Sequence, residues 1–221
     1  MGNAEYLGNS GILMVKKCIL YLRTDICDEE LIMGGSVGHT VGVINGFIQQ
    51  GYDVVCASSC MLRTLKTIPL VHLLPLQNPS SIKFLRWKIN SLLSSLFFFF
   101  QARKLVLNHS IVAIYQRYSL LNITGVLLAW WYKKKLILEY NGSEAWIVLN
   151  WGVKKRFFSG ALWMYGLERI NLSCADSIVV VSEVLKQELI ERGIASEKIL
   201  VNPNGVDPLI FTHKHQKMEY L

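Results

Sequence analysis

A glycine-rich stretch is the first part of the sequence whose residue types could bind a ligand. Gly34, Gly35, Ser36 and His39 follow the first apolar run and open a segment with helical periodicity. Glycines at the start of a helix let backbone N–H groups approach an anion at the positive end of the helix dipole. The same glycines would suit close packing of a helix on a sheet, and their spacing is not G-x-G-x-x-G. The stretch is a candidate anion-binding loop, and the packing role stays open.

A second candidate follows the apolar run at residues 111–115. Arg117 and Tyr118 would stand at the carboxyl end of a strand there, which is where open parallel sheets bind ligands. An arginine in this place suits an anionic or sugar ligand. An ion pair on the surface explains Arg117 equally well.

The elements that must position these residues alternate between strand and helix. Apolar and β-branched runs predict strands at residues 18–22, 53–58, 68–74, 111–115, 135–140, 178–181 and 199–201. Helical periodicity predicts helices at residues 35–51, 82–107, 122–132, 163–174 and 183–192, the last with Ser182 as N-cap and Gly193 just after its end. The sequence therefore predicts an α/β fold, a Rossmann-like, doubly wound and mostly parallel sheet with helices on both faces.

Two blocks near the end of this pattern carry a family resemblance. The block ADSIVVVSE from Ala175 to Glu183, followed at this distance by PNGVD from Pro203 to Asp207, closely resembles the end of the N-terminal domain of the GT-B glycosyltransferases of family 4. The resemblance extends from about Lys17 to Phe211. It implies that the chain is a single GT-B half.

The resemblance also assigns candidate site residues. The segment from Leu136 to Glu144 looks like the strand and loop that carry a His-Gly pair at the active cleft in many relatives, and Asn141 stands in the histidine position. The implied cleft residues are Glu139, Asn141, Gly142, Ser143 and Glu144, and the implied interdomain turn contains Asn204, Gly205 and Asp207. Asn141 can form neutral hydrogen bonds to a sugar or phosphate but cannot carry a proton as histidine can. Asn-Gly is also a turn dipeptide, so a role in the turn alone stays open.

The function that the resemblance implies is sugar transfer. The chain would be the acceptor-side domain, in which Gly34 and Gly35 face the donor diphosphate and the acceptor, a glycan or a lipid-linked molecule. The co-substrate would be a nucleotide-sugar, the anomeric configuration would be retained, and no metal would be needed. A donor-binding second domain is not recognisable in this sequence, so we expect the isolated chain to be inactive. The alternative is a non-catalytic binding domain, either half of a split enzyme or a truncated product.

The ends of the chain divide it into three expected parts. Residues 1–15 lack the features of a signal peptide, so we expect them to be disordered or to precede the true start codon. Residues 16–207 form the Rossmann-like domain. Residues 208–221 are a polar tail in which we expect the start of an interdomain linker.

The charge of the chain indicates which partners it could meet. The net charge is +7, with basic clusters at Lys133–Lys135 and Lys154–Arg156, and no nucleic-acid-binding motif accompanies them. The uncharged run at residues 89–102 is shorter than the roughly 20 residues of a spanning helix. The helix around it, with four phenylalanines and basic flanks, fits either the core or a membrane interface. We expect a cytoplasmic protein, with peripheral contact to the anionic inner face of the membrane or a solvated basic face as the alternatives.

The cysteines predict neither a disulfide framework nor a zinc site. There are five of them, and no two have C-x-x-C spacing. We expect reduced, buried thiols.

Overall fold

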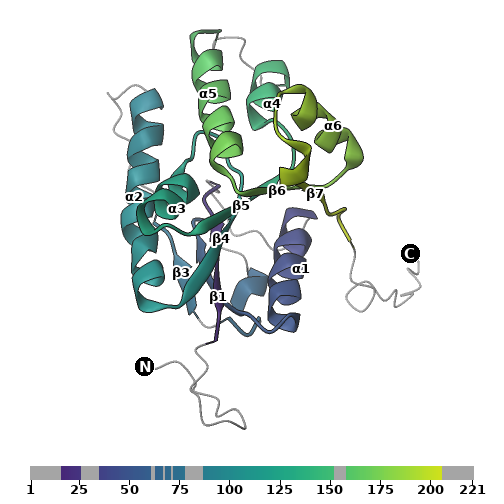
Figure 1. Cartoon of the computed structure of the whole chain (residues 1–221). Coiled ribbons are helices and arrows are strands. Elements are labelled where there is room, and N and C mark those ends of the chain that lie inside the picture. The colour runs from purple at the N-terminus through teal and green to yellow at the C-terminus, as the bar shows by residue number, and fades with distance from the viewer. Residues whose placement is uncertain are drawn as a thin grey trace, which may run out of the picture.

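The structure is a computed structural model that describes residues 16–25, 35–60, 63–66, 68–70, 72–77, 87–151 and 158–205. Within these ranges a seven-stranded sheet carries helices on both faces, as Figure 1 shows, which confirms the predicted fold class. Four predictions fall outside them: the nature of residues 1–15, the tail at 208–221, and the places of Gly34 and Asp207.

The described strands all pair in parallel, in the order β3-β2-β1-β4-β5-β6-β7. Their bounds are β1 Cys18–Arg23, β2 Asp53–Ser58, β3 His72–Pro75, β4 Ile111–Arg117, β5 Lys135–Tyr140, β6 Ser177–Val180 and β7 Ile199–Val201. The order reverses direction between β1 and β4. In open α/β sheets the ligand crevice lies beside such a reversal, outside the carboxyl ends of the strands.

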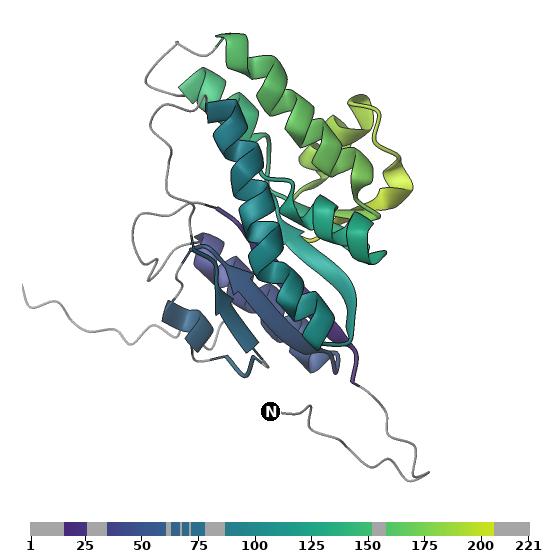
Figure 2. The ribbon, with the colours of Figure 1, turned by 90° about the vertical axis from the view of Figure 1, so that its left-hand side faces the viewer.

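The helices of the described residues cover the sheet unequally. Their bounds are α1 Gly35–Gln49, α2 Trp87–Asn108, α3 Thr124–Tyr132, α4 Glu144–Trp151, α5 Phe158–Cys174 and α6 Glu183–Glu191, with short 3₁₀ turns η1 Arg63–Lys66 and η2 Ser196–Lys198. One core lies under α1 and η1, and the larger one lies under α2, α3, α5 and α6 on the opposite face. Figure 2 shows α2 lying along the sheet with α3 beside it.

Three elements differ most from the sequence predictions, and one of them is α5, which begins at Phe158 rather than at residue 163. The third strand begins at His72 rather than at residue 68, because Ile68 to Leu70 forms a turn in which the Leu70 N–H donates to the Ile68 carbonyl. Proline at position 69 cannot donate to a sheet ladder, which explains the late start. Helix α4 was not predicted, because its sequence EAWIVLNW is apolar on almost every side and shows no helical stripe.

The four phenylalanines of α2 divide between the two predicted roles. Phe98 and Phe99 are buried in the larger core, whereas Phe97 and Phe100 are 39% and 53% exposed. No helix in the described part of the chain is long and apolar enough to span a membrane.

The prediction of five reduced and buried thiols is wrong for two cysteines. Cys18 and Cys56 are free and buried, and burial raises their thiol pKa values to about 11 and about 12. Cys60 is disulfide-bonded and Cys174 is exposed. Spacing alone did not show that Cys60 comes close enough to another cysteine for a bond.

Candidate functional site

Three charged side chains form a row at the carboxyl edge of the sheet. The parallel register pairs Arg23 of β1 with Arg117 of β4, and Arg117 with Glu139 of β5. Residues in register on parallel strands point to the same face, which is here the face covered by α1. The row therefore stands beside the reversal of strand order, where a ligand crevice is expected.

Glu139 is the centre of the first part of the row. Its side chain is buried, and its Oε1 accepts from Arg117 Nη1 at 2.5 Å and from Asn141 Nδ2 at 2.7 Å. His39 Nε2 of α1 lies 3.3 Å from the same oxygen. Burial raises the pKa of Glu139, but His39, Arg117 and Asn141 together outweigh burial and lower it. Glu139 is thus held as a carboxylate, and its Oε2 accepts no hydrogen bond from the described residues.

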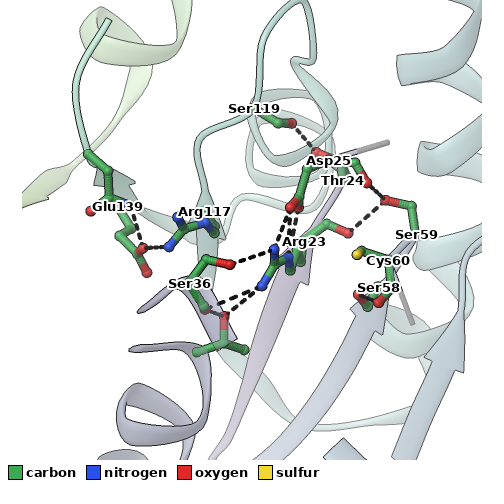
Figure 3. A network of polar contacts seen from close by, with 12 residues as sticks. Arg23, Thr24, Asp25, Ser36, Ser58, Ser59, Cys60, Arg117, Ser119 and Glu139 are labelled. Carbon is green, nitrogen blue, oxygen red and sulfur yellow. Dashed lines mark hydrogen bonds and ion pairs between the residues drawn. The ribbon is translucent and has the colours of Figure 1, made fainter. Parts of the chain in front are cut away.

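Arg23 is the other buried member of the row, and it is already neutralised. Its guanidinium donates to both carboxylate oxygens of Asp25, at 2.6 to 2.9 Å. It also donates to Thr40 Oγ1 at 3.1 Å and to the Ser36 carbonyl at 3.4 Å, which ties the start of α1 to the end of β1. Figure 3 shows Arg117 directed toward Glu139 and Arg23 directed toward Asp25 and Ser36. Arg23 therefore positions the start of α1.

Beside this row the surface is hollowed. The hollow has a volume of about 110 Å³ and is lined by Arg117, Tyr118, Asn141, Gly142, Glu144 and Ile147. Gly142 lies at a bend with φ +126°, a conformation that L residues rarely adopt, which gives a reason for glycine at this position. The side chain of Asn141 turns back to Glu139. Asn141 thus lines the hollow and also donates a hydrogen bond to Glu139.

Glu144 is the titratable group of the hollow that ionises near neutral pH. It is the first residue of α4, and its Oε2 accepts the backbone N–H of Leu120 at 2.6 Å. Burial raises its pKa to about 7, with Asp25 and Glu168 adding to the rise, while the Leu120 N–H and Arg117 oppose it. A carboxyl group with this pKa can donate and accept protons at neutral pH, which suits general acid–base chemistry.

A second buried glutamate lies on the opposite face of the sheet. Glu168 of α5 pairs with Arg192 at 2.5 Å, and its two oxygens accept from Tyr118, Tyr140 and Ser143 at 2.9 to 3.2 Å. The Arg192 guanidinium also donates to the Tyr140 hydroxyl and reaches Glu188. Glu188 lies four residues before Arg192, a spacing at which helix side chains meet, so this contact is a local one. The buried partner is 24 residues away from Arg192, and no local pattern indicates it.

Comparisons with known proteins decide the family. The family model of Glycosyltransferase Family 4 matches residues 33–208, which is most of the chain and includes every residue that lines the hollow. The chain belongs to Glycosyltransferase Family 4. A search of curated protein sequences finds no significant match.

Solved structures of GT-B glycosyltransferases and UDP-GlcNAc 2-epimerases share the fold of this Family 4 chain. A glycosyltransferase from Rickettsia africae ESF-5 aligns with TM-score 0.50 and 20% identity over 89% of this chain and 46% of its own length. UDP-GlcNAc 2-epimerase from Neisseria meningitidis bound to UDP-GlcNAc aligns with TM-score 0.56 and 10% identity, over 85% and 46%. A ugt transferase from Siraitia grosvenorii in complex with UDP aligns with TM-score 0.54 and 9% identity, over 86% and 51%. The Family 4 chain thus spans about half the length of these structures.

The Family 4 site unites most of the residues that the sequence analysis selected. The structure brings together His39, Arg117, Tyr118, Glu139, Asn141, Gly142 and Glu144. Ser36 is tied to Arg23 instead, and Ser143 donates to Glu168. Gly35 begins α1, and a Cβ there would meet nothing within 4 Å, so the described residues give no packing reason for this glycine.

The expected interdomain turn lies apart from the hollow. Asn204 and Gly205 are exposed and follow β7. Among the described strands, β7 is the edge strand farther from the reversal of strand order between β1 and β4. The residues that the sequence analysis missed are Arg23, Asp25 and Glu168. Arg23 was recognisable, because a charged residue that ends a fully apolar central strand needs a buried partner.

Proposed function

We propose that this chain is the acceptor-side domain of a retaining, metal-independent glycosyltransferase that moves a sugar from a nucleotide-sugar donor to a glycan or lipid-linked acceptor. Membership of Family 4 supports the reaction class. The observation that carries the proposal is the hollow at the carboxyl ends of β4 and β5. Its lining includes Arg117, which is paired with Glu139, and Glu144, whose pKa is raised to about 7.

The chemistry of the hollow fits binding of a sugar hydroxyl better than binding of a diphosphate. Arg117 is paired with Glu139, so little net positive charge remains for a phosphate. Glu144 and the peptide groups of the Asn141–Gly142 turn offer neutral or near-neutral hydrogen bonds. We therefore assign this wall to the acceptor and to the sugar being transferred.

Stabilising the departing nucleoside diphosphate needs donors and cations on its other side as well. In the proposal these come from a second domain, either in the same polypeptide or in a separate chain. The rival is a binding domain that holds a glycan without catalysing transfer. In a glycosyltransferase domain the donor and the acceptor would both contact this hollow, whereas in a binding domain only the glycan would.

The test is an NMR titration of the isotopically labelled chain with UDP-glucose and UDP-GlcNAc, both ligands of similar solved structures. We expect dissociation constants in the millimolar range, equivalent to about 4 kcal/mol, and shifts at Tyr118 and residues 141–144. The chain alone should release no UDP. UDP alone and NAD⁺ serve as controls for the nucleotide and for a nicotinamide-binding Rossmann protein.

Three outcomes would overturn the proposal. Shifts confined to other parts of the chain would place the sugar elsewhere. Micromolar binding of NAD⁺ would assign a different reaction class. Steady release of UDP by the purified chain would show that one wall is sufficient, against the two-wall argument.

A further inference from the structure

Helices α2 and α3 present an apolar surface that the core does not use. Seven large apolar side chains on it are exposed: Leu93, Leu96, Phe97, Phe100 and Leu107 on α2, and Trp130 and Trp131 on α3. The two helices lie side by side in both ribbon views, and the Trp131 ring is 6.1 Å from that of Phe99 (Figures 1 and 2). We call these seven residues the α2–α3 surface.

Helix α2 is apolar on both of its sides. Phe98, Phe99 and Ala102 face the core, while Phe97 and Phe100 face outward. A helix that is apolar all round is normally covered on both sides, by protein or by lipid. Trp130 and Trp131 are 74% and 64% exposed, and tryptophan favours the boundary between water and lipid.

Charge indicates what covers the surface. The sequence contains no Asp or Glu between Val54 and Leu138, but it contains 11 Lys and Arg residues there. Arg103, Lys104 and Lys133–Lys135 border the α2–α3 surface. Arg103 lies 5.1 Å above the Phe100 ring, and of the three lysines Lys135 pairs with Asp176. An apolar surface whose two helices carry basic and no acidic residues at its border is complementary to anionic lipid headgroups above an acyl layer.

We propose that the α2–α3 surface docks this chain on an anionic membrane, with the aromatic side chains at the headgroup boundary and the lysines on the headgroups. Trp130, Trp131 and the three lysines lie at the end of α3 and the start of β5, which is the amino edge of the sheet. The hollow lies at the carboxyl edge, one strand length or roughly 20 Å away. Docking in this way leaves the hollow open to the solvent.

The test is co-sedimentation of the full chain with vesicles of phosphatidylcholine, alone or mixed with phosphatidylglycerol. The chain should pellet only with the mixed vesicles, and less so at high salt. The triple variant Lys104→Gln, Lys133→Gln and Lys134→Gln should bind less tightly by about fivefold per lysine. The double variant Trp130→Ser and Trp131→Ser should lose about tenfold or more.

Matched controls separate docking from misfolding. Val184 is 78% exposed on α6, away from α2 and α3, so Val184→Ser removes an equally exposed apolar group and should leave binding unchanged. Lys186→Gln is the charge control on the same helix. Thermal unfolding of every variant shows whether the fold is kept.

Several results would overturn the proposal. Equal pelleting with pure phosphatidylcholine would contradict the role of charge in binding. No pelleting with either kind of vesicle would contradict membrane docking itself. Equal loss in the α6 controls would make the effect non-specific. A dimer in sedimentation velocity that the double tryptophan variant abolishes would assign the α2–α3 surface to a second copy of the chain.

Discussion

Glu139 and Glu168 are both fully buried and both paired with an arginine, yet their surroundings differ. Glu168 has hydrogen bonds to both oxygens, from an arginine, two tyrosines and a serine. Glu139 concentrates its contacts on Oε1, while its Oε2 accepts no hydrogen bond in the described part of the chain. A buried charge with every acceptor position used maintains the fold. An incompletely satisfied one beside a hollow is a better candidate for function.

The largest expected effect comes from replacing Glu168, the glutamate to which we assign a structural role. Glu168→Gln leaves the Arg192 guanidinium without its buried carboxylate, so we expect a loss of about 3 to 5 kcal/mol in the free energy of unfolding. Urea denaturation measures it. Glu188→Gln is the matched control, because Glu188 contacts the same arginine at 3.5 Å but is 46% exposed, and it should cost less than about 0.5 kcal/mol. Similar losses in both variants would contradict the comparison.

The second prediction concerns Glu144, which lies near both clusters. Its pKa is raised from 4.5 to about 7 in the folded chain, so the unfolded chain binds fewer protons between these values. Stability should therefore fall as the pH rises from about 4.5 to about 7. Glu144→Gln keeps an acceptor for the Leu120 N–H and removes the charge, so it should stabilise the chain by about 2 kcal/mol at pH 8. At pH 4 the variant and the natural chain should unfold alike, and a difference that is the same at both pH values would refute the assignment.

Glu139→Gln gives a smaller effect on stability. Glu139 accepts two side-chain hydrogen bonds whereas Glu168 accepts four, so fewer donors lose a charged partner and we expect a loss of about 1 to 2 kcal/mol. The same change should weaken binding of UDP-glucose in the NMR titration, because Arg117 and Asn141 lose their common anchor. A stability loss as large as that of Glu168→Gln, with unchanged binding, would make both glutamates structural.

The smallest expected effect concerns Tyr118, which connects the hollow to the hydrogen-bond cluster around Glu168. Tyr118 lines the hollow and donates to Glu168 Oε2 at 3.2 Å. Tyr118→Phe keeps the ring, which lies 5.5 Å from that of Tyr140, and removes only this hydrogen bond. We expect a loss of about 1 kcal/mol by thermal unfolding. No change would show that the remaining donors already satisfy Glu168.

Local chemistry explains which parts of the fold were predictable from the sequence. Uninterrupted β-branched runs indicated the buried parallel strands, and Ser182 capped α6 as expected, accepting the Leu185 N–H. Gly193 follows that helix with φ +84°, also as expected. Helix α4 escaped because an apolar helix at the surface has no amphipathic stripe.

The candidate site was predictable in its residues but not in its contacts. Arg117 was selected because it follows an apolar strand run, and Asn141 and Glu144 were selected through the family resemblance. Which of the selected residues contact each other was not predicted, because Glu139 lies 100 residues after its neighbour His39. Glu168 was not selected, and its partner Arg192 lies 24 residues away. Such contacts depend on sheet order, which no local pattern specifies.

The central place of β1 has a consequence during synthesis. Its strand partner β4 begins at Ile111, so β1 leaves the ribosome about ninety residues before one of its two neighbours exists. At 5 to 20 residues per second this interval lasts about 5 to 20 seconds. Throughout it the nascent chain offers an open edge on a strand whose six residues are all buried in the finished sheet, available to pair with another chain. The interval, rather than the finished sheet, is when this protein is most exposed to aggregation.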